Sequence, residues 1–249
     1  MNRFENKFAV VTGGNSGIGL ATARAFVDEG ARVLITGRNP ETLAAAKETL
    51  GDRATAVQAD VTKLDDLDNV FESAREQTDR IDALFVNAGI AKVVPFAQTD
   101  EATFDAIMDT NVKGAYFTVQ KALPLLGEGS SVVFNTSVAG SMGFPGFSVY
   151  GPSKAALRGL IRVLAVELSP LGIRANAVAP GPIETPLWGR VGLPEKDVQE
   201  MGGAIGEKVP MGRFGTADEV AAAVLFLSSA QSAYIQGAEL PVGGGIGDV

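Results

Sequence analysis

The chain has 249 residues, of which 46% are hydrophobic, and a formal net charge of −8 at pH 7. It contains neither histidine nor cysteine, which excludes thiol nucleophiles, Ser-His-Asp triads, disulfides and the usual zinc sites, and leaves acid–base chemistry to Asp, Glu, Lys and Tyr. The acidic balance argues against binding to nucleic acid or anionic membrane, and neither a membrane span nor a signal-peptide core is visible, so we expect a cytoplasmic protein without a metal.

Short β-branched runs alternate with helical patterns along the whole chain. Strands are expected at 8–12, 32–36, 55–58, 83–86, 131–135, 174–178 and 239–242, and helices near 17–29, 40–50, 64–78, 100–126, 150–169 and 217–229. This alternation predicts an α/β fold with a doubly wound, mostly parallel, seven-stranded sheet and helices on both faces. We expect residues 1–249 to form one domain. Its long stretch at about 180–209, rich in Gly and Pro, is expected to be irregular and to cover a substrate.

A glycine-rich turn follows the first expected strand, with the spacing Gly13-x-x-x-Gly17-x-Gly19. Glycines there permit a tight turn and let an anion approach the free amides of the next helix. Any tight strand-to-helix turn uses glycines, and the spacing differs from the commonest dinucleotide fingerprint. Its position between the first strand and the first helix nevertheless favours binding of a dinucleotide pyrophosphate.

The second expected strand is followed by Gly37 and Arg38. An NAD enzyme places an acidic residue here to bind the ribose 2′-hydroxyl, whereas Gly37 leaves room for a 2′-phosphate and the planar guanidinium of Arg38 suits it. The pattern favours NADP(H) over NAD(H). The alternative is an ordinary exposed arginine before a helix.

The helix expected at 150–169 carries an apolar stripe at Leu157, Ile161, Leu164 and Leu168. The same steps, extended backwards, reach Lys154 and Tyr150. A Tyr-x-x-x-Lys pair arises by chance in some chains, and a lysine near a helix end can also extend its ammonium to solvent. If the pair is functional, the ammonium should favour tyrosinate and lower the pKa of Tyr150.

Together these motifs resemble the short-chain dehydrogenase/reductase family, in its short single-domain branch, nearly from end to end. The resemblance rests on Thr12-Gly-x-x-x-Gly-Ile-Gly19, Asp60-Val61, Asn87-Ala88-Gly89, Asn111, Ser137, Tyr150-x-x-x-Lys154 and Pro180-Gly181-Pro182-Ile183-x-Thr185. The chain departs from the family where Val86 replaces a frequent Asn and Gly243 replaces a frequent Asp. The second departure puts a contact near the C-terminal tail in doubt. The resemblance implies a Rossmann-type fold.

The resemblance also implies four catalytic residues. Tyr150 is expected to be the general acid in carbonyl reduction and the base in the reverse reaction, and Lys154 to tune it and hold the nicotinamide ribose. Ser137 is expected to donate to the substrate oxygen. Asn111 is expected to hold a water that relays protons to Lys154. Taken alone, a strand-end serine and a helical asparagine would be ordinary structural residues.

The implied cofactor site spans the glycine loop, several strand ends and the segment after the sixth strand. Asp60 is expected near the adenine, and Ile183 and Thr185 near the nicotinamide carboxamide. The family often has a second basic residue at the position of Ser16, which is absent here. The full set of expected contacts is Gly13, Asn15, Ser16, Gly17, Ile18, Gly19, Arg38, Asp60, Val61, Asn87, Ala88, Gly89, Tyr150, Lys154, Pro180, Gly181, Ile183 and Thr185.

We therefore expect an NADP(H)-dependent oxidoreductase that reduces a small apolar ketone or aldehyde reversibly. The expected pocket walls are apolar residues of two segments, Met142, Phe144, Phe147, Leu187, Trp188, Leu193 and Met201. Trp188 and its neighbours are alternatively a subunit contact.

The same resemblance leaves two alternative functions open and implies an oligomer. One alternative is a 3-oxoacyl-acyl-carrier-protein reductase, although the turns at 125–130 and 169–172 lack the basic residues such enzymes often use. Another is a cofactor-binding regulator without catalysis, which would typically lack Tyr150 or Lys154. The family usually forms dimers or tetramers, so we expect a homo-oligomer, favouring a homotetramer, with close helix packing at Ala155, Ala156 and Gly159.

Overall fold

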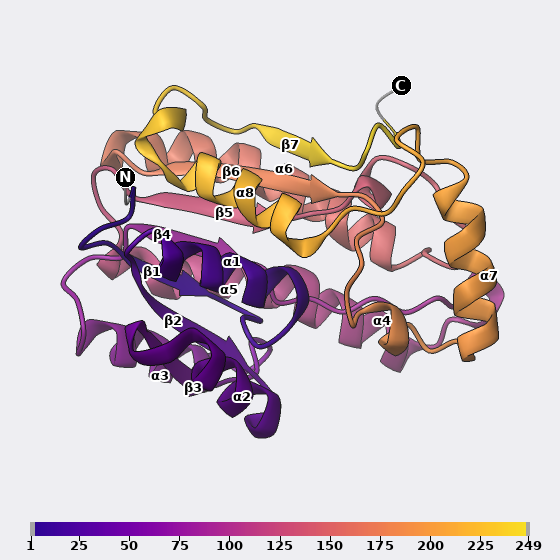
Figure 1. Ribbon diagram of the computed structural model, residues 1–249, viewed down its shortest axis with the longest axis horizontal. Helices are drawn as coiled ribbons and strands as arrows, with labels where there is room; N and C mark the ends of the chain where they lie inside the picture. The colour runs from indigo at the N-terminus through magenta and orange to yellow at the C-terminus, as the bar shows by residue number, and fades with distance from the viewer. Residues whose placement is uncertain (1–2, 248–249) are drawn as a thin grey trace.

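The computed structural model describes residues 3–247, and its central feature is one sheet of seven parallel strands (Figure 1). The strands lie in the order β3-β2-β1-β4-β5-β6-β7. They are β1 (Phe8–Val11), β2 (Arg32–Gly37), β3 (Ala54–Gln58), β4 (Ala83–Val86), β5 (Ser131–Asn135), β6 (Arg174–Pro180) and β7 (Glu239–Val242). The sequence prediction of a seven-stranded parallel sheet is thus confirmed.

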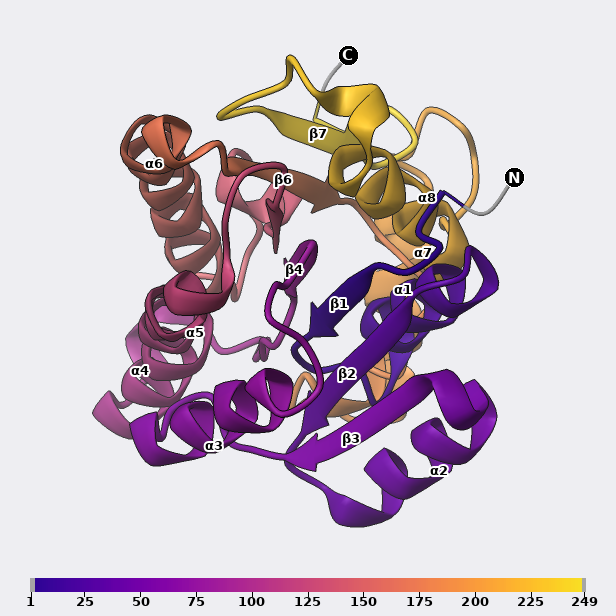
Figure 2. The same ribbon diagram turned by 90° about the vertical axis from the view of Figure 1, so that its left-hand side faces the viewer.

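Helices cover both faces of this sheet. They are α1 (Gly17–Asp28), α2 (Pro40–Leu50), α3 (Leu64–Arg75), α4 (Glu101–Met108), α5 (Gly114–Ala122), α6 (Tyr150–Leu168), α7 (Glu195–Gly206) and α8 (Ala217–Ser228). Figure 2 shows α1, α2 and α8 on one side of the strands and α3, α4, α5 and α6 on the other. The strand order reverses between β1 and β4, which is where open α/β sheets bind their ligands.

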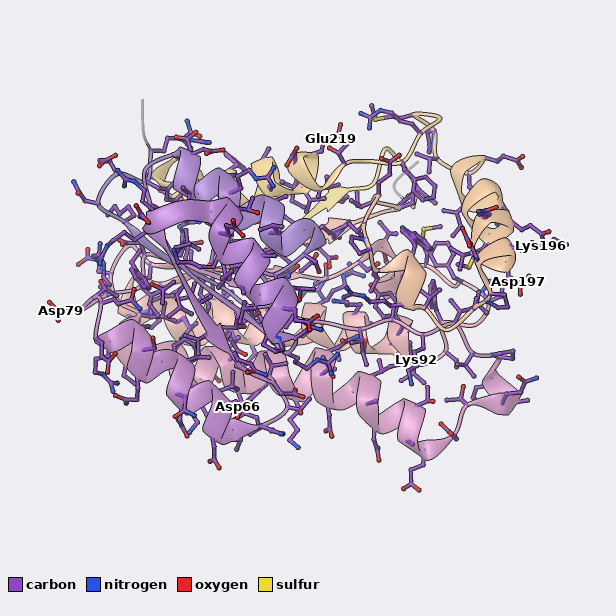
Figure 3. The ribbon with its side chains drawn as sticks, turned by 60° about the horizontal axis from the view of Figure 1, so that its bottom comes forward. Asp66, Asp79, Lys92, Lys196, Asp197 and Glu219 are labelled. Atoms are coloured by element: carbon purple, nitrogen blue, oxygen red, sulfur yellow. The ribbon has the colours of Figure 1, made fainter. Side chains whose placement is uncertain are left out.

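The two hydrophobic cores follow from the alternation of side chains along the strands. In β1, Ala9 and Val11 belong to the core under α1, α2 and α8, whereas Phe8 and Val10 belong to the core on the opposite face. Because successive strand residues point to opposite faces, a strand buried on both sides must be apolar throughout. Of the charged side chains labelled in Figure 3, the exposed Asp79, Lys196 and Asp197 lie instead at the edges of the molecule.

The structure differs from the sequence prediction in two helical regions. The helix expected at 100–126 is divided into α4, a π-helical turn η3 (Asp109–Lys113) and α5. The stretch at 180–209, expected to be irregular, contains the short helix η7 (Trp188–Arg190) and α7. The sequence prediction missed α7 because the glycines and prolines of this stretch indicate a loop and its apolar residues show little helical periodicity. Among residues 3–247, no helix is long and apolar enough to cross a bilayer.

Candidate active site

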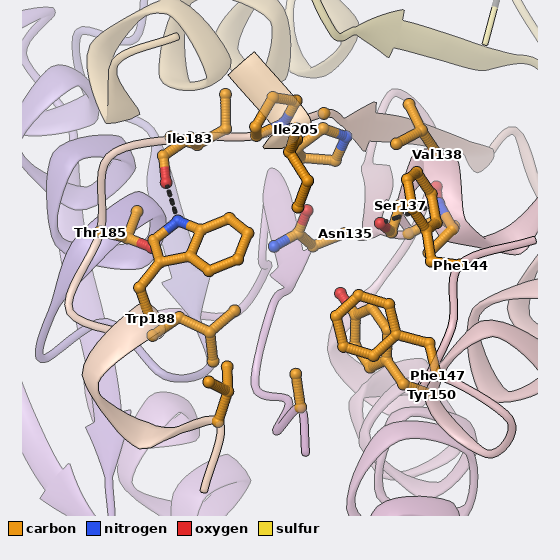
Figure 4. A pocket seen from close by; sticks show the side chains of 18 of the residues that line it. Asn135, Ser137, Val138, Phe144, Phe147, Tyr150, Ile183, Thr185, Trp188 and Ile205 are labelled. Atoms are coloured by element: carbon orange, nitrogen blue, oxygen red, sulfur yellow. Dashed lines mark hydrogen bonds between the residues drawn. The ribbon is translucent and has the colours of Figure 1, made fainter. Parts of the chain in front are cut away.

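Two adjoining cavities open at the carboxyl ends of the strands. The first, here called the groove, has a volume of about 710 Å³ and runs past the Gly13–Gly19 loop, the end of β2 and the end of β4. The second, the small cavity, has a volume of about 120 Å³ and lies beside Ser137 and Tyr150 (Figure 4). Asn135 and Tyr150 line both cavities, so a ligand in the groove would meet a ligand in the small cavity next to Tyr150.

The glycine loop leaves the backbone of its first turn open to the groove. A Cβ atom on Gly19 would lie 2.1 Å from the carbonyl oxygen of Gly13, so only glycine fits there. Ser16 caps α1 without a side-chain hydrogen bond to the helix amides. The free amides of the first turn of α1 form the positive end of the helix dipole, and this end borders the groove. Because it attracts anions, it fits the pyrophosphate of a dinucleotide.

A chain of hydrogen bonds connects the glycine loop with the centre of the site. The Nδ2 of Asn87 donates to the carbonyl oxygens of Thr12 (2.9 Å) and Gly13 (3.2 Å). Its Oδ1 accepts from the Nδ2 of Asn135 at 2.9 Å, and the carbonyl oxygen of Asn135 accepts from the ammonium of Lys154 at 2.7 Å. The position of Lys154 is therefore fixed through Asn135 and Asn87 to the loop itself.

Tyr150 and Lys154 begin α6, and Ser137 follows β5. The Lys154 ammonium lies 5.8 Å from the centre of the Tyr150 ring, and the Ser137 hydroxyl is near enough to the Tyr150 hydroxyl to lower its pKa. Ser137 also accepts a hydrogen bond from the amide of Ala139 at 3.2 Å, which orients its hydroxyl oxygen. The structure thus brings together the strand-end serine and the helical pair that the sequence separates by 13 residues.

The expected lowering of the Tyr150 pKa is wrong. Burial raises the pKa of Tyr150, and the hydrogen bond from Ser137 offsets only part of that rise. Burial also lowers the pKa of Lys154 to about 8. The reason is that desolvation disfavours both charged forms, while the ammonium protons face the Asn135 carbonyl.

Asn111 lies in the π-helical turn and is 1% exposed. Its side chain accepts from the amide of Ile90 (2.8 Å) and donates to the carbonyl of Ile90 (2.9 Å) and the hydroxyl of Ser153 (3.0 Å). A Cβ atom placed on Gly89 would be 3.2 Å from the Asn111 Oδ1 and 3.5 Å from the Lys154 Nζ. Asn111 therefore joins the β4 loop to α6, and both its Oδ1 and the Lys154 ammonium lie close to Gly89.

The groove carries positive charge in an acidic protein. Its lining includes four basic residues, Arg38, Lys92, Lys154 and Arg190, and one acidic residue, Asp60. The Arg38 side chain is 60% exposed and lies 4.0 Å from the Asp60 carboxylate, so its guanidinium remains largely open to the groove. All expected cofactor contacts line the groove except Pro180, Gly181 and Ile183, which line the small cavity.

The small cavity has apolar walls around the two hydroxyls. Trp188 lies across it from Tyr150 in Figure 4, held by a hydrogen bond of 2.8 Å from its indole nitrogen to the Ile183 carbonyl. Phe144, Phe147 and Leu187 line it as expected, whereas Met142, Leu193 and Met201 do not. Apolar residues that were not predicted as pocket walls also line it, among them Ile18, Ala91, Val138, Val191, Ile205 and Ile246.

Asn135 is the main residue of the site that sequence reasoning missed. Its Oδ1 is buried without a hydrogen-bond partner, although Asn135 borders both cavities. A buried carbonyl oxygen of this kind usually has a partner, which here would be a ligand or water in the cavities. The available signal was its position at the carboxyl end of β5, directly before Thr136 and Ser137.

The chain is similar to known oxidoreductases along almost its whole length. A family model described as enoyl-(acyl carrier protein) reductase matches residues 13–247. The 3-oxoacyl-(acyl-carrier-protein) reductase FabG of Thermotoga maritima is 37% identical, over 98% of this chain and 99% of that protein. The 2-(S)-hydroxypropyl-CoM dehydrogenase 3 of Xanthobacter autotrophicus is 38% identical, over 98% of each.

Solved structures show the same fold. Levodione reductase superposes with a TM-score of 0.91 at 32% identity, covering 98% of both chains. A 3-ketoacyl-(acyl-carrier-protein) reductase from Brucella melitensis complexed with NADH gives a TM-score of 0.89 at 31% identity, covering 98% of this chain and 99% of that one. A protein of the same fold and similar sequence thus binds a nicotinamide dinucleotide.

Proposed function

This chain belongs to the short-chain dehydrogenase/reductase family and is an oxidoreductase acting on the CH–OH/C=O couple, and we propose that it reduces a small apolar ketone or aldehyde with NADP(H), reversibly. The observation that carries the proposal is the small cavity. There the Ser137 and Tyr150 hydroxyls meet an apolar wall, directly beside the groove that suits a dinucleotide. A carbonyl oxygen placed between these hydroxyls would leave the rest of a small substrate against apolar side chains.

The residues of the groove fit a nicotinamide dinucleotide. The glycine loop and the α1 amides would hold the pyrophosphate, Asp60 and Val61 the adenine side, and Lys154 the nicotinamide ribose. The unpartnered Oδ1 of Asn135 would accept a hydrogen bond where the two cavities meet. When bound, the cofactor supplies or accepts the hydride of the reaction.

The chain's own residues supply the proton. In reduction, the Tyr150 hydroxyl transfers its proton to the carbonyl oxygen as negative charge develops there, while the Ser137 hydroxyl donates a hydrogen bond to the same oxygen. Lys154 holds positive charge near the phenolate that remains. Asn111 acts as the positioning residue for the water that would return a proton through Lys154, because its Oδ1 lies beside Gly89 and the ammonium.

The end of β2 supports NADP(H) over NAD(H). A Cβ atom on the buried Gly37 would lie 2.6 Å from the Asn15 side chain, so an acidic residue cannot be introduced there without displacing Asn15. Asn15 is itself held by a hydrogen bond of 2.8 Å to the Thr42 hydroxyl. Arg38 adjoins this arrangement and would pair with a 2′-phosphate.

The small cavity supports a free, uncharged substrate. The residues that line it include no Asp, Glu, Lys or Arg, and its volume of about 120 Å³ suits a compact molecule. The segment at about 180–209, with η7 and α7, would act as a lid over this substrate. The alternative is a carrier-bound 3-oxoacyl chain, favoured by the similarity to the reductase of Thermotoga maritima. A non-catalytic regulator is disfavoured because Tyr150 and Lys154 are both present and adjacent.

The experiment is a panel of carbonyl compounds assayed by cofactor absorbance with NADPH and NADH. We expect the highest kcat/KM for small apolar ketones or aldehydes with NADPH. Preference for an acetoacetyl thioester on acyl carrier protein would establish the carrier-bound alternative. Failure to oxidise the cofactor with any carbonyl would contradict the proposed reaction.

The catalytic assignment has its own test in Tyr150→Phe. This substitution keeps the ring and removes the acid, so we expect kcat to fall by about 100- to 10,000-fold with cofactor affinity nearly unchanged. Tyr116→Phe is the matched control, because Tyr116 is an exposed tyrosine of α5. Retention of more than roughly a tenth of the rate in Tyr150→Phe would assign the acid elsewhere.

A further inference from the structure

The residues after β7 form a glycine-rich segment, 243–247, that folds back over the active site and is here called the hook. The amide of Gly181 donates to the Val242 carbonyl at 3.1 Å, and the amide of Met211 donates to the Gly244 carbonyl at 3.1 Å. The first bond fixes the end of β7, from which the hook starts, to the end of β6, and the second attaches the hook to the segment after α7. Gly244 has φ +63° and approaches Val209 so closely that a Cβ atom would lie 2.8 Å from its Cγ1.

Ile246 is the only residue of the hook with a side chain, and that side chain is buried. It is 3% exposed, packs in one apolar cluster with Val138 and Val209, and lines the small cavity. Val138 lies across this cavity from Trp188 in Figure 4. The hook therefore supplies part of the wall opposite Trp188.

Gly243 makes this placement possible. A Cβ atom there would lie 3.2 Å from the Ile246 Cγ2 and 3.3 Å from the Val138 Cγ1, which is tighter than an ordinary contact. An acidic side chain at this position would therefore begin against two apolar side chains and a carbonyl oxygen, which is unfavourable for a carboxylate. Gly243, noted in the sequence as a departure from the family, is thus the position that lets Ile246 reach the small cavity.

We propose that the hook determines substrate specificity, with Ile246 as the residue that limits the length of the apolar group accepted on the Val138 side of the small cavity. This inference rests on the proposed function, because the occupant is the apolar part of the ketone or alcohol. The substrate class is accordingly narrowed to uncharged carbonyl compounds with a short apolar substituent. A smaller side chain at position 246 should lengthen the small cavity, and a larger side chain there should shorten it.

The chain contains one tryptophan, Trp188, and it lines the small cavity, so its fluorescence reports binding without turnover. The experiment titrates the protein, without cofactor, with 2-alkanols of increasing chain length and records Trp188 fluorescence. In the wild type, each added methylene that fits should tighten binding by about fourfold until a limiting length is reached. Beyond that length affinity should fall.

The variants should move this limit in opposite directions. We expect Ile246→Ala to shift it by about two or three carbons toward longer alkanols, Ile246→Val to shift it less, and Ile246→Phe to shift it toward shorter ones. Gly243→Asp should resemble Ile246→Ala, because it displaces the hook. Ile81→Ala is the matched control, since Ile81 is fully buried in the core that contains Phe8 and Val10 and does not line the small cavity.

A limit that is the same in Ile246→Ala and Ile246→Phe, or that moves equally in Ile81→Ala, would overturn the proposal. The same series of 2-alkanones, measured as kcat/KM with NADPH, separates this failure from that of the proposed function. Reduction of ketones with an unchanged length limit refutes the hook alone. No reduction of any ketone refutes the proposed reaction, while the fluorescence series still decides the role of Ile246.

Discussion

At the level of single residues, burial shifts the pKa values of Tyr150 and Lys154 in opposite directions. It raises the pKa of Tyr150 and lowers that of Lys154 to about 8. The phenol is therefore fully protonated at neutral pH, as a proton donor for carbonyl reduction must be. Alcohol oxidation needs the phenolate and should have its optimum at higher pH than reduction.

The lowered pKa of Lys154 predicts a pH-dependent stability. Between pH 8 and the unfolded value of 10.5, the unfolded chain binds a proton that the folded chain has lost, so stability rises with pH in this window. We expect the free energy of unfolding of the wild type, minus that of Lys154→Met, to increase by about 2 kcal/mol from pH 8 to about pH 9.5. Denaturant titrations at several pH values measure it.

The measurements on Lys154 stay below pH 10 because Tyr150 begins to contribute to the pH dependence above that pH. The raised pKa of Tyr150 acts in the opposite sense, because its contribution to stability is present below the unfolded value of 10.0 and is lost at higher pH. Below pH 10 the difference between wild type and Lys154→Met isolates the lysine. A difference that does not change with pH would mean that Lys154 is charged and solvated in the folded protein.

Arg38 permits a test of the cofactor preference. A hydrogen bond to a charged group contributes about 1.5–3 kcal/mol, so Arg38→Ala should weaken NADPH binding by roughly 10- to 150-fold and leave NADH binding almost unchanged. Fluorescence titration of both cofactors measures this. Arg24→Ala, which removes an equal charge from the exposed surface of α1, is the control. Equal losses for both cofactors, or a wild-type preference for NADH, would contradict the NADP(H) proposal.

At the level of elements, the segment after β6 is attached to the rest of the molecule at several points, and Trp188 lies between them. Ile183 pairs with Gly215 in an isolated bridge, which joins the two ends of the segment. Between them, Val191 accepts a hydrogen bond of 2.9 Å from the amide of Val93, so the segment also contacts the loop after β4. Trp188 lies between these attachment points and packs against Phe214, with ring centres 5.8 Å apart.

Trp188→Ala tests whether this segment acts as a lid on the substrate. We expect KM to rise by about tenfold for bulky apolar ketones and much less for small polar ones, because only the former bury surface against the indole. Trp188→Phe should retain most of the selectivity. An equal change for all substrates, or a change in oligomeric state without a kinetic effect, would favour a subunit contact.

At the level of the whole molecule, the layer formed by α4, α5 and α6 presents apolar side chains to solvent. Val163 and Val166 of α6 are 53% and 74% exposed, and Tyr116 of α5 is 46% exposed. The small residues Ala155, Ala156 and Gly159, also exposed, lie on the same helix α6. We propose that this layer packs against a second copy in a dimer or tetramer, because small residues permit close helix packing and exposed apolar patches mark interfaces.

Val166→Asp tests the proposed assembly. A charge buried at an apolar interface without a partner is unfavourable, so we expect the variant to sediment as a smaller species than the wild type in analytical ultracentrifugation. Leu64→Asp, which adds the same charge at an exposed apolar residue of α3, should sediment as the wild type does. Identical sedimentation of wild type and Val166→Asp would exclude α6 from the interface.

The sequence alone determined the sheet, most helices and the candidate residues of the proposed site. Strands such as Ala83–Val86 and Ser131–Asn135 were predicted at their observed bounds, because apolar β-branched runs between turn residues have few alternatives. The helix expected at 40–50 was likewise predicted at its observed bounds, and the structure shows Asn39 capping it before Pro40. Tyr150 and Lys154 were found because residues four apart on a helix share a face, a purely local relation.

Only the tertiary structure decided the properties that depend on segments distant in sequence. The direction of the Tyr150 pKa shift follows from burial of the hydroxyl, which no local pattern contains. The small cavity likewise combines Val138, Trp188 and Ile246, whose approach depends on how β5, the lid segment and the hook fold together. Spacing along a helix or strand is local and can be read from the chain. Desolvation and cavity shape arise from three-dimensional packing and cannot.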